Sequence, residues 1–203
     1  MAVAPVVLTL SRSGESTAHK IAALLGAKVH GRKGRVDQAD AFFTNALDHT
    51  RDLFAAGVPV IGVCASGILI RAVGPLLMDK LAEPPVLSVS DDGAVVVPLL
   101  GGHRGANKLA AQIADALGAI AAVTTAGDVA LGVALDEPPA GWALVNRDDA
   151  KGAMAALLSG GGAKVGGDAP WLANLPVGDT LQISATMDCI ADLGETHLQF
   201  APQ

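Results

Sequence analysis

The chain has 203 residues, of which 51% are hydrophobic and only 3% aromatic, and its formal net charge at pH 7 is −6. A negatively charged chain repels the phosphate backbone, which argues against a general nucleic-acid-binding surface. The two cysteines, Cys64 and Cys189, lie far apart in the sequence. This excludes a disulfide framework and a zinc-ligand spacing, and it favours two buried structural thiols.

Nothing in the sequence indicates export or a membrane. The first residues, Met1 to Pro5, show no basic segment ahead of an apolar run, so we expect no signal peptide and a cytoplasmic location. The stretch from Leu53 to Ile70 carries no charge over 18 residues, which is the lower limit for a membrane span. Glycines and a proline interrupt it, which favours a strand, a turn and the start of a buried helix.

Strand and helix patterns alternate from residue 3 to about residue 125, which predicts an α/β fold with a doubly wound, mostly parallel sheet. Apolar runs predict strands, and apolar residues at helical spacing predict helices. The predicted strands cover 3–10, 27–30, 58–63, 86–89, 94–100 and 120–124. Helices are predicted over 48–56 and 106–117, and a further one carries Ala18 to Leu25 after an N-cap at Ser13 or Ser16. The turn Asp91-Asp92-Gly93 is typical of a β-hairpin, so the strands on either side of it are expected to be antiparallel.

The pattern changes after Ala126. We predict one domain over residues 1–126 and a smaller appended α/β unit over 127–203. In the second part, the sequence predicts a strand at 142–145, a helix at 147–158, glycine-rich loops at 159–162 and 166–167, and edge strands at 180–184 and 196–200.

A glycine-rich turn joins the predicted strand ending at Leu100 to the helix starting at Ala106. It contains Gly101, Gly102, His103 and Arg104. A helix N-terminus at the end of a strand offers unpaired backbone N–H groups, which suit an anion. Turns of this kind also have purely structural roles, and the pattern leaves both interpretations open.

A second strand-to-helix junction, from Cys64 to Lys80, contains a turn of small residues, Ser66 and Gly67. Ser66 as a nucleophile would require a base and an orienting acid that the spacing does not identify, so a helix N-cap is favoured. The basic loop from Gly31 to Arg35 is interpreted as a solvated loop or as a contact for an acidic ligand.

Several familiar motifs are absent from the sequence. It contains no P-loop and no G-x-G-x-x-G after the first strand, which argues against a usual dinucleotide fold. The five histidines show no zinc-ligand spacing.

Two longer motifs occur in order along the chain. The first is Ser66-Gly67-Ile68-x-x-Arg71-x-x-Gly74-Pro75-Leu76-Leu77-x-Asp79-Lys80, and the second is Val97-Pro98-Leu99-Leu100-Gly101-Gly102-His103-x-Gly105-Ala106-Asn107-x-Leu109-Ala110. With Ala122 to Ala126 after them, they resemble the CbiG family of cobalamin biosynthesis. The resemblance covers most of the chain, matches the family's N-terminal and middle regions, and is strongest from about residue 60 to 127.

The resemblance implies a cobalt-precorrin-5A hydrolase, which opens a δ-lactone on the tetrapyrrole ring and releases a two-carbon fragment as acetaldehyde. It implies no cofactor, because cobalt enters only as part of the substrate. The family's C-terminal G-I-G-C-R-R-G type motif is missing, so we expect one portion of a longer or split protein. The family also occurs fused to precorrin-3B C17-methyltransferase, so the alternative is a non-catalytic corrinoid-binding domain of such a protein.

The expected substrate is an acidic tetrapyrrole rimmed with acetate and propionate groups, and other corrin-pathway enzymes are possible partners. His103 is the expected general base, because imidazole titrates near neutral pH. Both junctions follow predicted strands that we interpret as running in the same direction, so we expect Arg71 to face the turn at 101–103 across one cleft. The expected substrate-binding residues are Ser66, Gly67, Arg71, Lys80, Gly101, Gly102, Arg104 and Asn107.

Overall fold

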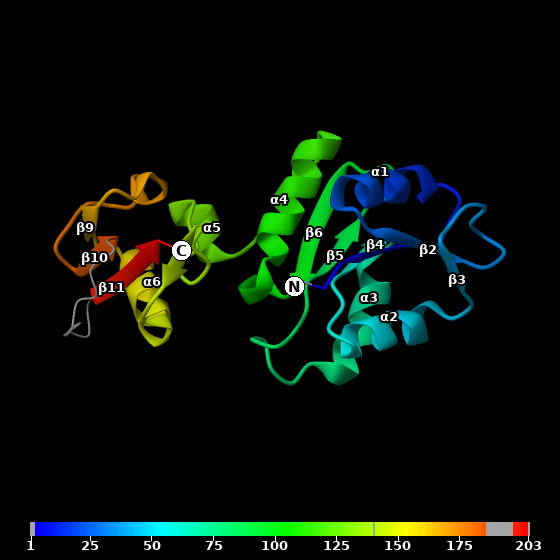
Figure 1. Ribbon diagram of the computed structural model, residues 1–203, viewed down its shortest axis with the longest axis horizontal. Helices are drawn as coiled ribbons and strands as arrows, with labels where there is room; N and C mark the ends of the chain where they lie inside the picture. Colours follow the sequence, from blue (N-terminus) through cyan, green and yellow to red (C-terminus); the bar gives the residue numbers. More distant parts are fainter. Residues whose placement is uncertain (1–2, 140, 186–196, 203) are drawn as a thin grey trace. The chain divides into compact units, whose positions relative to one another are not determined.

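The computed structural model describes residues 3–139, 141–185 and 197–202, and it divides the chain into two compact units (Figure 1). The first unit covers residues 1–123 and the second covers residues 124–203. The division after Val123 falls slightly before the predicted boundary at Ala126. Each unit is described by itself.

The first unit is built on a seven-stranded sheet in the order β3-β2-β1-β4-β5-β6-β7. The strands β1 to β5 are parallel, β6 is antiparallel to β5, and β7 is parallel to β6. Their bounds are β1 Val6–Thr9, β2 Lys28–Arg32, β3 Ala41–Phe43, β4 Val60–Val63, β5 Val86–Val89, β6 Val95–Leu100 and β7 Ile120–Ala121. The predicted mostly parallel α/β sheet is confirmed, although the short strand β3 was not predicted.

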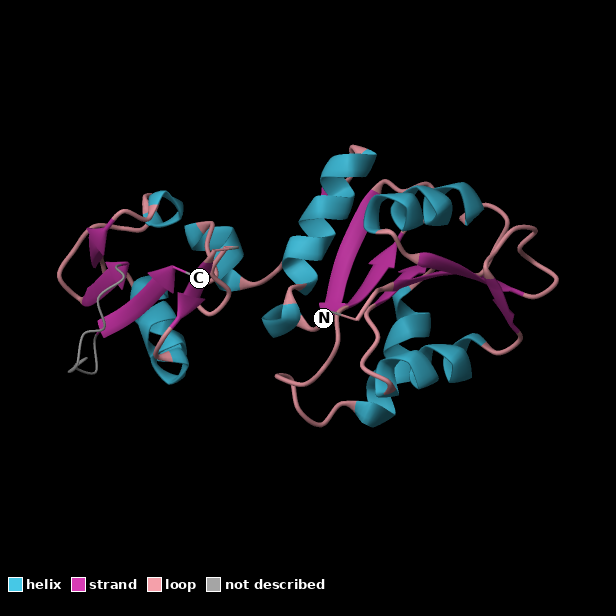
Figure 2. Ribbon diagram, viewed as in Figure 1, coloured by secondary structure: helices cyan, strands magenta, loops and turns pink. Residues whose placement is uncertain are grey.

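Helices cover both faces of this sheet (Figure 2). The helices α1 (Glu15–Leu25) and α4 (Ala106–Leu117) pack on one face, over a core that includes Val7, Ile61 and Val96. The helices α2 (Ala46–Ala55) and α3 (Ser66–Val73) pack on the other face. The buried side chains of α4 are those that its helical spacing predicted, namely Ala106, Ala110, Ile113 and Ala114, with Leu109 and Leu117 partly buried. Because many of these side chains are small, the helix and the sheet can approach closely.

The second unit has its own four-stranded sheet, in the order β8-β11-β10-β9, and its own core. The strands β9, β10 and β11 are parallel to one another, and β8 is antiparallel to β11. The bounds are α5 Ala126–Leu131, β8 Trp142–Leu144, α6 Ala150–Leu158, β9 Ala163–Gly167, β10 Leu181–Ala185 and β11 His197–Pro202. The described parts of both units also contain four short 3-10 helices, η1 Gly74–Leu76, η2 Gly102–Arg104, η3 Arg147–Asp149 and η4 Pro170–Leu172.

Three expectations for the second unit need correction. The predicted edge strands are the two inner strands, β10 and β11, because each is paired on both sides. The predicted loop at 166–167 belongs to β9, since pairing with β10 extends that strand through both glycines. The predicted helix at 147–158 begins as η3 and continues as α6. Thr196 and Cys189, on which two further expectations fell, lie outside the described residues.

No helix within the described ranges combines the length and the hydropathy that crossing a bilayer requires. The uncharged stretch from Leu53 to Ile70 instead includes the end of α2, the strand β4 and the first part of α3. This is the strand, turn and helix start that its glycines and proline indicated.

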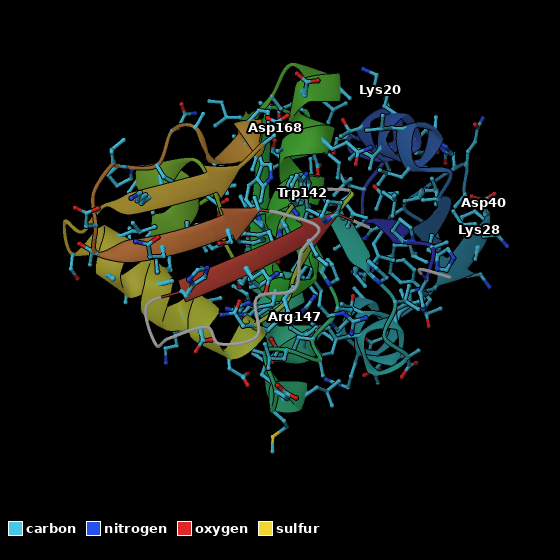
Figure 3. All side chains as sticks on the ribbon, turned by 60° about the vertical axis from the view of Figure 1, so that its left-hand side comes forward. Lys20, Lys28, Asp40, Trp142, Arg147 and Asp168 are labelled. Carbon is cyan, nitrogen blue, oxygen red and sulfur yellow. The ribbon has the colours of Figure 1, made fainter. Side chains whose placement is uncertain are left out.

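Two histidines connect the strand β2 to the helix α2. Nδ1 of His30 lies 2.9 Å from Nε2 of His49, and the ring of Phe43 stacks on His49 with centroids 4.7 Å apart. Burial lowers the pKa of both imidazoles, and the pKa of His30 is lowered further by His49. Lys28 also lowers the pKa of His30, whereas Asp40 raises it (both are labelled in Figure 3), and Asp52 raises that of His49.

This pair predicts a pH-dependent stability. Because the pKa of each imidazole is lower in the folded state, the unfolded chain binds more protons as the pH falls below about 6.5. We expect the free energy of unfolding, measured by urea titration, to decrease from pH 7.5 to pH 5.5. The double variant His30→Gln/His49→Gln should lose much of this dependence, whereas the exposed His19→Gln should keep it. An equal pH dependence in all three proteins would contradict the assignment.

Candidate functional site

The two predicted junctions lie at opposite ends of the sheet. We call the end where β1 to β5 finish the carboxyl edge, and the end where they start the amino edge. In the sheet, Leu100 pairs with Val86, which pairs with Val60, and the latter two residues are the first of β5 and β4. The turn after Leu100 is therefore at the amino edge, whereas Ser66, after β4, is at the carboxyl edge.

The expectation of one cleft shared by His103 and Arg71 is therefore wrong. It assumed that the strands before the two junctions run in the same direction, but β6 is antiparallel to β4 and β5. The length of a four-residue strand, roughly 10 Å at 3.3 Å per residue, separates the two ends of β4.

At the amino edge, the glycine-rich turn has a structural reason for its first glycine. Gly101 is buried and has φ +77°, and a Cβ atom placed on it would lie 2.6 Å from the backbone of Pro85. The carbonyl of Gly101 accepts hydrogen bonds from the backbone N–H groups of Arg104 and Ala106, at 2.9 and 3.1 Å. A side chain at Gly101 would break this close packing, whereas Gly102 faces open space.

The turn brings several predicted site residues to the amino edge. His103 and Arg104 are exposed, and Asn107 is half-buried in the first turn of α4. The guanidinium of Arg104 donates a hydrogen bond to the carbonyl of Ala82 at 2.7 Å, which joins the turn to the exposed loop that carries Lys80. Arg104 thus contributes to holding two loops together.

The cavity at the amino edge has the wrong lining for an acidic ligand. Its volume is about 300 Å³, and apolar side chains such as Phe54 and Met78 line it together with the carboxylates of Asp79 and Glu83. Carboxylates repel an anion, so this cavity does not provide the contacts that a ring rimmed with carboxylates would need.

At the carboxyl edge, Asp91 joins two loops. One of its carboxylate oxygens, Oδ2, accepts hydrogen bonds from the hydroxyls of Ser11 at 2.8 Å and Ser13 at 2.5 Å. Its backbone carbonyl accepts a hydrogen bond from Thr17 at 2.8 Å, and the buried Gly14 packs beside its side chain. The turn after β5 is thereby fixed against the loop that leads from β1 to α1.

A third loop, which follows β2, is held against the loop between β1 and α1. Arg12 forms a salt bridge with Asp37, with 2.7 Å between Nε and Oδ2. The carboxylate of Glu15 accepts hydrogen bonds from the backbone N–H groups of Asp37 and Gln38. Three loops of the carboxyl edge therefore hold one another in place, which pre-organises this surface for binding.

This edge also contains the topological switch point of the sheet. The strand β1 lies between β2 and β4, and the chain leaves β1 toward α1 on one face and leaves β4 toward α3 on the other. In open α/β sheets, the crevice between two such diverging connections is the usual place for a ligand.

One cavity of this edge is lined by hydroxyls. Its volume is about 230 Å³, and its lining includes Cys64, Ser66, Ser88, Ser90 and Asp91. The expectation that Ser66 caps α3 is wrong, because Ala65 is the N-cap and no side chain caps the helix. Burial, followed by the charge of Asp91, raises the pKa of the Cys64 thiol to about 12, so the thiol stays protonated.

A second cavity of the carboxyl edge contains two arginines. Its volume is about 490 Å³, and its lining includes Leu10, Arg32, Asn45, Ile68 and Arg71. Arg71 also donates a hydrogen bond within α3 to the carbonyl of Gly67, at 3.0 Å. The fold thus brings Arg71 together with Arg32, while Ser66 lines the first cavity.

Sequence reasoning missed Ser11, Ser13 and Asp91 as a group. A serine-rich stretch directly after the first predicted strand was the available signal, because that position is at the carboxyl end of a central strand. Asp91 was interpreted only as a hairpin residue. Across the described ranges, no group of three metal-ligating side chains is present.

Comparison with known proteins relates this chain to cobalamin biosynthesis. Residues 48–128 match the family model described as Cobalamin synthesis G N-terminal. The chain is 33% identical over 129 residues to the cobalt-precorrin-5A hydrolase of Salmonella typhimurium, and 36% identical over 85 residues to that of Priestia megaterium. The predicted resemblance is confirmed.

Over this region the chain is similar to the CbiG family. The match to its N-terminal model includes every site residue that the sequence predicted, from Ser66 to Asn107, but not the loop after β1 or Arg32. The two alignments cover 63% and 41% of this chain, and only 37% and 23% of the Salmonella and Priestia proteins. The chain thus matches about a third or less of each of these relatives.

A solved structure supports the fold of this chain. The crystal structure of a cobalamin biosynthesis protein G homolog from Sulfolobus solfataricus is similar with a TM-score of 0.51 and 19% sequence identity. The similarity covers 97% of this chain and 60% of that chain.

The two neighbouring glycines of the turn provide a matched test of its structural role. Gly101→Ala should lower the free energy of unfolding by about 2–4 kcal/mol, because a side chain there is strained at positive φ and meets the backbone of Pro85. Gly102→Ala should change it by about 0.5 kcal/mol or less, since its Cβ would meet no atom within 4 Å. Urea unfolding of both variants measures the difference, and similar losses would contradict this account.

Proposed function

We propose that this chain acts in corrin ring biosynthesis by binding an acidic, precorrin-type tetrapyrrole, as part of a cobalt-precorrin-5A hydrolase that opens the ring δ-lactone and releases acetaldehyde. The observation that carries the proposal is the match of residues 48–128 to the N-terminal region of the CbiG family. The Salmonella and Priestia relatives are both named cobalt-precorrin-5A hydrolase.

The substrate is proposed to bind at the carboxyl edge. The switch point, the three loops tied together through Asp91 and Arg12, and the two cavities are all at this edge. A ring rimmed with acetate and propionate groups needs cations and hydroxyls as partners. Arg32 and Arg71 supply the cations here, and Ser66 supplies a hydroxyl.

The amino edge is the weaker candidate, although it holds more of the residues that the sequence singled out. Arg104 is engaged with a carbonyl, and two carboxylates line the neighbouring cavity. His103 acts as the general base only if the substrate binds at the amino edge, where Lys80 also lies. The carboxyl-edge proposal therefore assigns no proton transfer to His103.

Binding of a carboxylate-rimmed corrin tests the proposal. We expect cobyrinic acid, whose rim carries free acetate and propionate groups, to change its visible absorption on titration with the protein at ligand concentrations up to ~1 mM. Cobinamide, in which the rim carboxylates are amides, is the matched control and should bind more weakly. No response to cobyrinic acid would refute the proposed function.

The same titration tests which edge of the sheet binds the substrate. If the ring binds at the carboxyl edge, His103→Ala should leave the affinity for cobyrinic acid unchanged within about twofold. A large loss of affinity in a variant that unfolds at the same urea concentration as the wild type would move the site to the amino edge.

Turnover separates binding from catalysis. Acetaldehyde released from cobalt-precorrin-5A by this chain alone would assign the lactone opening to it. Binding without release would favour the alternative, a corrinoid-binding region that contributes to a larger protein.

A further inference from the structure

We propose that Arg32 and Arg71 form a pocket for a carboxylate group, which holds one acetate or propionate side chain of the tetrapyrrole. The identity of the parent ligand rests on the proposed function. The pocket itself is argued from the two guanidinium groups and the cavity that they line, and it is tested separately with simple anions.

The two arginines converge on one cavity from distant parts of the sequence. Arg32 is the last residue of β2, and Arg71 lies in the second turn of α3. Both line the cavity of about 490 Å³ that opens at the carboxyl edge, together with Leu10 at the end of β1 and Asn45 at the start of α2. A cavity of this volume has ample space for a small organic acid.

Within the described residues, neither guanidinium meets a carboxylate. The two salt bridges of arginine found there join Arg12 to Asp37 and Arg51 to Asp48. Asp48, in the first turn of α2, is thus already paired. Arg71 donates to a carbonyl of its own helix, and Arg32 is half-buried. Two positive charges that share a cavity repel each other, and a bound anion would offset this repulsion.

The lining favours a carboxylate on a short apolar stem. Each guanidinium offers a planar fork of N–H donors, which matches the two oxygens of a carboxylate. Leu10 and Ile68 provide apolar contacts for the methylene carbons of the same side chain. The side-chain oxygen of Asn45 accepts hydrogen bonds from the backbone N–H groups of Leu47 and Asp48 and thereby caps α2. Its side-chain NH2 group is a neutral donor of the kind that can add to the two charged ones.

The absence of a side chain at Gly67 lets Arg71 take its position. A Cβ atom on Gly67 would lie 2.9 Å from Nη1 of Arg71, which is the far end of a flexible side chain. Gly67→Ala therefore displaces the guanidinium without disturbing the backbone. This substitution tests the position of the charge separately from its presence.

The experiment titrates the full chain with propionate and follows the Nε–H signals of arginine by NMR, with chloride at equal ionic strength as the reference. We expect propionate to shift the signals of Arg32 and Arg71. Arg32→Gln and Arg71→Gln should each weaken binding roughly tenfold or more, as expected for the loss of a charge-assisted contact. Gly67→Ala should weaken it less. Arg147→Gln, which removes an exposed arginine of the second unit, should have no effect.

Three outcomes would overturn the pocket. Propionate could shift neither arginine signal, Arg147→Gln could weaken binding as much as Arg71→Gln, or inorganic phosphate could bind as tightly as propionate or more tightly. Urea unfolding of each variant shows that a loss of binding is not a loss of folded protein.

Cobyrinic acid distinguishes this proposal from the proposed function. If it binds equally to the wild type and to Arg32→Gln/Arg71→Gln, the function stands and the pocket is wrong. If propionate binds at the two arginines but cobyrinic acid does not bind to the wild type, the pocket stands and the proposed function is wrong. The expected result is a cobyrinic acid affinity at least tenfold lower in the double variant.

Discussion

The direction of β6 decides where the charged loops of the first unit lie, and a turn of four residues fixes that direction. The hydroxyl of Ser90 donates a hydrogen bond to the carboxylate of Asp92 at 2.6 Å and accepts one from the N–H of Val95. Gly93, whose φ is +75°, donates a hydrogen bond from its N–H to the carbonyl of Ser90. This hydrogen bonding reverses the chain within the turn, so β6 must run antiparallel to β5. The helix α4 consequently begins at the amino edge.

The same turn also builds the opposite edge. Asp91 points to the loop after β1, where its carboxylate holds the hydroxyls of Ser11 and Ser13. The residue beside it, Asp92, has its pKa lowered by the hydrogen bond from Ser90 and then by the N–H of Ala94, so it stays ionised as part of the turn. Two adjacent aspartates thus have different roles, one within the hairpin and one between loops.

The charge distribution gives the two edges different chemistry. At the amino edge, Arg104 is bound to a carbonyl, and carboxylates line the nearby cavity. At the carboxyl edge, two arginines line a cavity without a carboxylate partner within the described residues. A chain with a net charge of −6 can therefore still present a local site for an acidic ligand, because the field at short range depends on the nearest charges.

The periodic elements can be predicted from residue spacing. The buried face of α4, the hairpin at Asp91-Asp92-Gly93 and the alternation of the first unit follow from residue spacing, because apolar periodicity and turn chemistry act over a few neighbouring residues. The three-residue strand β3 was missed because so short a run has no readable period, and β9 was missed because only its pairing with β10 makes Gly166 and Gly167 part of a strand.

The candidate site depends on contacts that form only in the folded sheet. The hairpin already implied that β6 runs opposite to β5, yet the sequence motifs at Gly101 and Ser66 look alike, and only the assembled sheet shows that they face opposite edges. Asp91 contacts Ser11 across 80 positions of the chain, and Arg32 and Arg71 line one cavity. Contacts of this range depend on strand order and helix packing, which local propensities do not encode, so the candidate site had to be read from the fold.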